Sequence, residues 1–134
     1  MKRWRYWGHR DKEDSFKLII MVEVPGEDGV DRGTPLKHIE RHSPTGMEWG
    51  YMGSGPSDLA LSILVDYVIR ARAALGKLCT EEEAIRLVDR QQMYMKFRDK
   101  VIALADRKHF SITFDDIRTF IRENWVLTNG HSND

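Results

Sequence analysis

The sequence changes character at residue 56, and this change limits what the chain can fold into. Residues 1–56 contain eight of the ten glycines, which separate short runs of alternating or apolar residues. This pattern is typical of strands and turns. Residues 57–134 contain only Gly76 and Gly130, and their apolar residues recur at helical spacing. The sequence therefore predicts an α+β fold, with a small antiparallel β-sheet from the N-terminal half packed against about three C-terminal α-helices.

The N-terminal half contains four candidate strands. Arginine and aromatic residues alternate over residues 3–7, and residues 16–24 have an unbroken apolar centre that suggests burial on both faces. Residues 36–42 alternate again, and residues 47–51 are expected to pair with them across the intervening turn. These four segments are the expected sheet.

Three helices are expected in the C-terminal half. A mainly buried helix is predicted over about residues 56–74, with Pro56 at its first position. The Thr80–Glu83 capping box begins a second helix that is predicted to reach about residue 106. A third helix is expected to begin at residues 113–116. We expect residues 1–127 to form one domain and residues 128–134 to be a flexible C-terminal tail.

Charge and cysteine content exclude several classes of protein. The 134 residues include 21 Lys and Arg and 21 Asp and Glu, so the formal net charge is zero. A general nucleic-acid coat or a membrane-surface binder would carry a positive excess. The single cysteine, Cys79, excludes an internal disulfide and a thiolate zinc cluster, and it fits a reducing cytoplasm. The first residues do not resemble a signal peptide, so a cytoplasmic protein is expected.

Residues 42–61 contain the densest group of unusual residues. Three glycines interrupt the predicted strand end and lead into a helix start, whose free N–H groups attract phosphate or carboxylate. The alternative is a tight strand-to-helix turn in which the glycines have only a structural role. The predicted ligand-binding or partner-binding residues are His42, Glu48, Trp49, Tyr51, Gly53, Ser54, Gly55, Ser57 and Asp58.

This segment resembles the signature of a family of small uncharacterised bacterial and phage proteins that share a domain of unknown function. The family stretch reads HSPxGFEWGYGGSGPADLAL, and the chain matches it at most positions between His42 and Leu61. Met47 and Met52 are departures, since the family has an aromatic residue and a glycine there. The similarity extends from Tyr6 to the expected third helix. It implies a phage or mobile-element context and supplies no mechanism.

Two histidines and a carboxylate raise the question of a metal site. If residues 36–42 form a strand, His38, Glu40 and His42 project from the same face, and this set could bind iron or zinc. The order differs from the helical zinc motif of metalloproteases, and a solvent-facing polar row has the same pattern. We therefore expect no bound metal and no cofactor.

Evidence for catalysis is weak. Ser54 and Ser57 lie beside a helix start but outside any nucleophile-elbow motif, and Cys79 has no recognised catalytic partner. We assign no catalytic residues, and an enzyme is the less favoured hypothesis. If the protein is an enzyme, we expect a small metal-dependent or hydrolytic enzyme centred on His42 and Glu48.

Basic and aromatic residues at the N-terminus support a second alternative. Cationic side chains contact phosphates while aromatic rings stack on bases, so this strand could bind a single-stranded nucleic acid. The residues proposed for that role are Arg3, Trp4, Arg5 and Arg10. An edge strand with its aromatic side chains turned inward has the same alternation.

The leading hypothesis is a non-enzymatic binding protein of phage or mobile-element type. It would act through a protein partner or a small anionic ligand, in an anti-defence or host-takeover role.

Overall fold

The computed structural model describes residues 3–127 and shows an antiparallel sheet of four strands. The strands are β1 (Arg5–Arg10), β2 (Leu18–Val24), β3 (Arg32–Pro35) and β4 (His109–Thr113). Their order across the sheet is β3-β2-β1-β4, and every neighbouring pair is antiparallel. Three strands come from the N-terminal half, and β1 and β2 overlap the strands predicted over residues 3–7 and 16–24. Neither β3 nor β4, which comes from the C-terminal half, was predicted.

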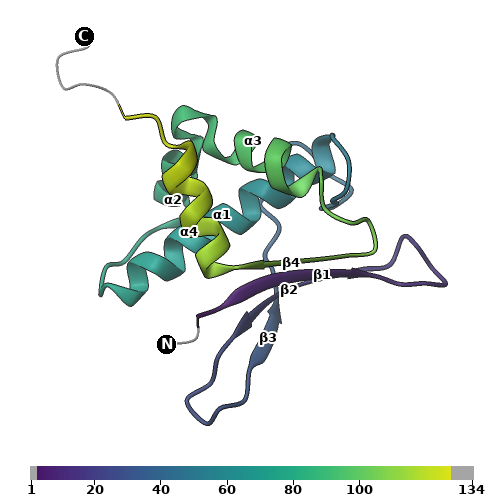
Figure 1. The fold of residues 1–134 in the computed structure, drawn as a ribbon, viewed down its shortest axis with the longest axis horizontal. Helices are drawn as coiled ribbons and strands as arrows, with labels where there is room; N and C mark the ends of the chain where they lie inside the picture. The colour runs from purple at the N-terminus through teal and green to yellow at the C-terminus, as the bar shows by residue number, and fades with distance from the viewer. Residues whose placement is uncertain (1–2, 128–134) are drawn as a thin grey trace.

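The helices gather on one side of this sheet (Figure 1). They are α1 (Ser54–Ala74), α2 (Glu81–Asp89), α3 (Met93–Phe97) and α4 (Phe114–Asn124), with a short 3-10 turn at Arg90–Gln92 and a π-helical turn at Arg98–Ile102. The α+β prediction is therefore confirmed. The tail predicted for residues 128–134 lies outside the described residues.

The core lies between the sheet and α1. Along β1 the burial alternates, so Tyr6 is fully buried while Arg5 on the opposite face is not. Opposite Tyr6 in the flanking strands are Val22 and Ile112, which are also buried. Helix α1 is buried on nearly all sides from Gly55 to Val65, which agrees with its lack of a wide polar face.

The predicted helix over residues 80–106 is wrong in its extent. The capping box at Thr80 and Glu83 is present and begins α2, but the helix ends at Asp89. Gln91 and Gln92 adopt left-handed backbone conformations, with φ of 53° and 55°. Because the left-handed region is incompatible with a continuous right-handed helix, the chain turns there and resumes as α3.

Two predicted strands are also wrong. Residues 36–42 and 47–51 form no strand, and residues 32–35 form β3 instead. In the first segment the buried side chains are Leu36 and Ile39, three residues apart, so its apparent alternation does not reflect two faces of a sheet. The segment packs against α1, where the Ile39 N–H donates to Ser62 Oγ at 2.8 Å.

Within residues 3–127, no helix has the length and apolar character needed to cross a membrane.

Candidate functional site

Asp58 organises the signature segment. Its side chain is fully buried near the start of α1, and it accepts a hydrogen bond from His38 Nε2 at 2.7 Å. The same carboxylate accepts from the backbone N–H groups of Arg41, His42 and Ser43, at 2.8–3.2 Å. Burial alone would raise the pKa of Asp58, but these hydrogen bonds outweigh burial and hold the pKa below its ordinary value.

A cavity of about 430 Å³ lies beside the start of α1. Its wall brings together four of the predicted binding residues, Glu48, Tyr51, Ser54 and Gly55. The apolar part of the wall includes Phe16, Leu18 and Met47. Phe16 lies just before β2 and Leu18 is its first residue, and no local sequence signal connects them to the signature segment.

The N-terminus of α1 has no side-chain cap. Gly53 is the residue before the helix, and no acidic side chain lies in the first turn. The N–H groups of Ser54 and Gly55 donate to no acceptor within residues 3–127, while the Ser57 N–H donates to the Gly53 carbonyl at 3.0 Å. The free donors are therefore those of Ser54 and Gly55, and not those of Ser57 and Asp58.

Two glycines of the signature are required by close packing. Gly50 has a φ of +87°, and a Cβ there would lie 2.6 Å from Arg107 Cγ. At Gly55, a Cβ would lie 2.8 Å from Glu48 Cβ. Any larger residue at Gly55 would push the chain at Glu48 away from α1, so Gly55 helps set the shape of the cavity wall.

The Glu48 carboxylate is neutralised by Arg10. One guanidinium nitrogen lies 3.1 Å from Glu48 Oε2 and the other contacts Oε1, so the pair is bidentate. The hydrogen bond that Arg10 donates to Glu48 also raises the pKa of Arg10. The guanidinium carbon of Arg10 lies 5.1 Å from the centre of the Trp49 ring. An anion in the cavity therefore meets an ion pair at Glu48 and not an isolated negative charge.

Two further arginines contact residues of the signature segment. The Arg107 guanidinium lies over the ring of Tyr51, at 5.5 Å from its centre. Arg98 donates to Ser57 Oγ at 2.9 Å in the first turns of α1. Neither arginine was predicted as a site residue, because both lie far from the signature in sequence.

Five of the nine predicted binding residues do not line the cavity: His42, Trp49, Gly53, Ser57 and Asp58. Trp49 is fully buried, donates from Nε1 to the Asp106 carbonyl at 2.9 Å, and packs edge-to-face on Phe110. His42 is exposed, and its Nε2 lies 2.8 Å from the hydroxyl of Tyr94. Neither of these side chains lines the cavity.

The predicted metal-ligating set is not assembled on a strand. His38 is bonded to Asp58 and His42 to Tyr94, while Glu40 is exposed between them. Within residues 3–127, no group of three His, Cys, Asp or Glu side chains is placed to hold a metal ion. Cys79 is partly buried, and its Sγ lies 3.5 Å from the Thr80 carbonyl.

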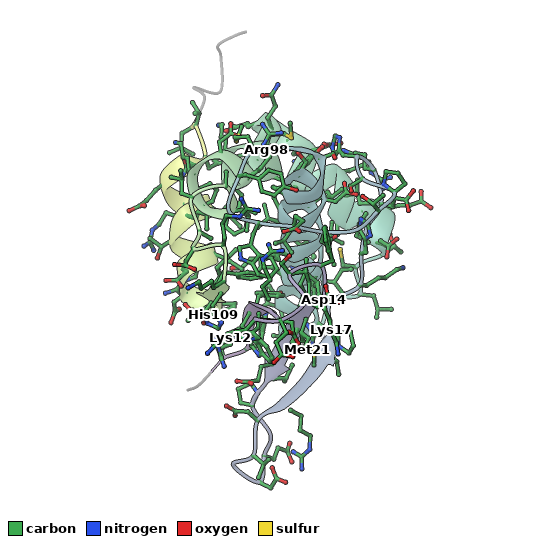
Figure 2. All side chains as sticks on the ribbon, turned by 90° about the vertical axis from the view of Figure 1, so that its right-hand side faces the viewer. Lys12, Asp14, Lys17, Met21, Arg98 and His109 are labelled. Carbon is green, nitrogen blue, oxygen red and sulfur yellow. The ribbon has the colours of Figure 1, made fainter. Side chains whose placement is uncertain are left out.

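The four residues proposed for nucleic-acid binding are divided between two environments. Trp4 is buried and donates to the Tyr6 hydroxyl at 3.0 Å, and Arg10 is bonded to Glu48. Arg3 lies over the Phe114 ring, and Arg5 pairs with Glu23 at 3.0 Å. The lysines Lys12 and Lys17 lie beside the sheet instead (Figure 2).

Comparison with known proteins identifies a family. The model of the "Family of unknown function (DUF6166)" matches residues 6–90, which is more than half of the chain. The match runs from β1 to α2 and contains every residue predicted for the binding site. No curated protein and no solved structure matches the chain.

Proposed function

This chain belongs to the DUF6166 family of unknown function, and we propose that it is a non-enzymatic binding protein whose ligand is a small anion. The ligand would occupy the cavity of about 430 Å³ at the start of α1. The observation that carries this proposal is that Glu48, Tyr51, Ser54 and Gly55, predicted from the signature, line one cavity beside two unused helix N–H groups. The volume lies in the range of about 300–1,000 Å³ that is typical of small-molecule sites.

The chemistry of the wall favours a carboxylate or phosphate with an apolar portion. The N–H groups of Ser54 and Gly55 carry the partial positive charge of the helix N-terminus. Asp58 would oppose an anion if it capped these donors, but its carboxylate is bonded to His38 and to backbone N–H groups of residues 41–43. Phe16 and Leu18 supply an apolar surface for the remainder of the ligand.

A variant that supplies its own anion tests this proposal. Ser54→Asp places a carboxylate at the first position of α1, where it competes with the ligand and interacts favourably with the helix dipole. We expect the affinity for phosphate or hexanoate, measured by calorimetry, to fall about tenfold or more, with an unchanged or higher melting temperature. The matched control Ser54→Asn adds no charge and should retain binding.

Three results would contradict the proposal. The first is that the wild-type protein binds neither probe. The second is that Ser54→Asp and Ser54→Asn weaken binding equally. The third is that the loss of binding in every variant follows a loss of stability, because the signature turn would then be structural.

The two alternatives have less support from the geometry. For nucleic-acid binding, Trp4 and Arg10 are engaged inside the fold. For a metal-dependent or hydrolytic enzyme, His42 and Glu48 are bonded to Tyr94 and Arg10 and not to each other. Salt-dependent binding to single strands would favour the first alternative, and a stoichiometric metal in the purified protein would favour the second.

The biological setting is part of the proposal. A phage or mobile-element origin, an anti-defence or host-takeover role and a cytoplasmic location rest on the family resemblance and on the cysteine content. The identity of the neighbouring genes tests the setting independently of any binding measurement.

A further inference from the structure

An apolar groove lies between the helices, away from the cavity of the signature segment. It has a volume of about 260 Å³ and is lined by residues of α1, α2 and α3 and by the end of α4. Its wall includes Val68, Leu87, Val88, Met93, Ile121 and Trp125. Apart from Arg72, every lining residue is aliphatic or aromatic or is methionine. The groove is smaller than the pockets of about 300 Å³ or more that hold small molecules, so it suits individual side chains of a larger partner.

Three arginines lie along one side of this groove. Arg72, Arg86 and Arg90 surround a surface depression that shares Arg72 and Leu87 with the groove. Within residues 3–127, none of these three side chains forms a hydrogen bond or a direct ion pair, although Arg72 and Arg86 attract the Glu83 carboxylate at longer range. The depression contains these three arginines and two carboxylates, so its rim carries an excess of positive charge.

The two carboxylates in this depression also have hydrogen-bond partners outside the groove. Glu83 accepts hydrogen bonds from the N–H and the hydroxyl of Thr80 in the capping box of α2. Asp89 accepts from the Arg41 guanidinium at 2.9 Å. Asp89 is therefore paired with an arginine outside the depression, while Glu83 offsets part of the charge of Arg72 and Arg86.

The groove is held in shape by the kink between α2 and α3. The Gln91 side chain donates to the Val126 carbonyl at 2.8 Å and accepts from the Val126 N–H at 2.7 Å. This double hydrogen bond fixes the chain just after α4, where Trp125 lines the groove with 37% of its surface exposed. The apolar wall is thus formed before any partner binds, which lowers the entropy cost of binding.

We propose that this groove binds an acidic amphipathic helix of another protein. Apolar side chains of that helix would enter the groove beside Trp125, and carboxylates along one of its edges would pair with Arg72, Arg86 and Arg90. Aromatic, methionine and arginine side chains are enriched at the centres of protein interfaces, and all three occur here. This proposal is independent of the anion cavity at the start of α1.

Other occupants fit the groove less well. Residues 128–134 contain no large apolar side chain that would match the aliphatic wall. A second copy packed about a two-fold axis would bring the same arginines against one another. A nucleic acid would satisfy the arginines but would leave most of the aliphatic wall without a matching surface.

A displayed peptide library provides a test that assumes no particular partner. The library contains helical peptides of about 16 residues, roughly four turns, with randomised surface positions. We expect the full-length protein to enrich peptides with apolar residues at positions i, i+3 or i+4, and i+7, and with Asp or Glu beside them. The absence of such enrichment would overturn the proposal.

Charge-reversed variants locate the binding of the enriched peptide. Arg86→Glu with Arg90→Glu should weaken binding tenfold or more, and Trp125→Ala should weaken it while leaving the melting temperature near that of the wild type. The matched control, Lys12→Glu with Lys108→Glu, makes the same change in net charge at exposed lysines outside the groove and should bind normally.

Three outcomes would overturn the proposal at this stage. Equal loss of binding in the control would show that net charge alone is responsible. Displacement of the peptide by a single-stranded oligonucleotide would assign the arginines to a nucleic acid. Dimerisation that Arg86→Glu with Arg90→Glu changes, measured by sedimentation, would assign the groove to a second copy of the chain.

Discussion

Asp58 and His38 lie 20 residues apart in the sequence and are joined by a 2.7 Å hydrogen bond inside the molecule. Because an ionised carboxylate only accepts hydrogen bonds, the imidazole Nε2 must be the donor. The same buried carboxylate holds three consecutive backbone N–H groups, those of residues 41–43. A single side chain of α1 thus replaces the strand pairing that residues 36–42 lack.

The role of Asp58 predicts acid sensitivity. Its folded-state pKa is held below the value of about 3.9 expected in the unfolded chain, so the unfolded state binds the proton more readily. The stability that Asp58 contributes is therefore fully present above about pH 4 and is lost as the pH falls through the folded-state pKa. We expect the urea midpoint to fall as the pH is lowered through this range. Asp58→Asn should make the midpoint less dependent on pH, and it should lower the free energy of unfolding at pH 7 by about 3 kcal/mol.

Part of the candidate site, the signature segment, could be predicted from the sequence. The pattern located the start of α1 to within two residues, since Pro56 was expected at the first position and the helix begins at Ser54. Asp58 was predicted as a ligand-binding residue because its N–H group was expected at an open helix start, but its carboxylate instead accepts hydrogen bonds from His38 and from residues 41–43. The pairing of Glu48 with Arg10 spans 38 residues and depends on tertiary folding, so no local pattern predicts it.

Leu64→Ala tests the central position of α1. Leu64 is fully buried, as predicted from the apolar circumference of this helix. Truncation to alanine removes buried methyl groups and leaves a cavity between α1 and its neighbours, so we expect a loss of about 2–5 kcal/mol. The measurement is the free energy of unfolding from urea denaturation. A loss well below 1 kcal/mol would contradict this packing.

Trp49→Ala should cost much more stability than His42→Ala. Trp49 is fully buried against Phe110, so its truncation should cost about 3–5 kcal/mol. His42 is exposed and makes one side-chain hydrogen bond to Tyr94, so His42→Ala should cost about 1 kcal/mol or less. Thermal melts of both variants check this. Similar costs for the two would show that one environment is described incorrectly.

β4 and the break after α2 could not be predicted, because neither is marked by a local pattern of residue types. β4 is only five residues long and directly precedes α4, so its alternation could not be separated from the helix start that follows. Its position beside β1 depends on contacts across more than a hundred residues. The break at Gln91 and Gln92 contains neither glycine nor proline, so nothing in the residue types marked the end of α2.

The two left-handed glutamines provide a prediction with an internal control. A non-glycine residue in this region costs about 1–2 kcal/mol, whereas glycine adopts it freely but loses about 0.5–1 kcal/mol through its greater freedom in the unfolded chain. Gln92 is exposed and its side chain makes no hydrogen bond within residues 3–127. We therefore expect Gln92→Gly to raise the free energy of unfolding by up to about 1 kcal/mol.

Gln91→Gly relieves the same backbone conformation, with a φ of 53°, but also removes both hydrogen bonds to Val126. Each such bond contributes about 0.5–1.5 kcal/mol, so the gain should be cancelled or reversed. Urea denaturation of the two variants under identical conditions measures the difference directly. Equal stabilisation by both would mean that the Gln91 clamp does not hold the chain after α4. A loss of stability in Gln92→Gly would mean that the turn between α2 and α3 does not adopt the left-handed backbone.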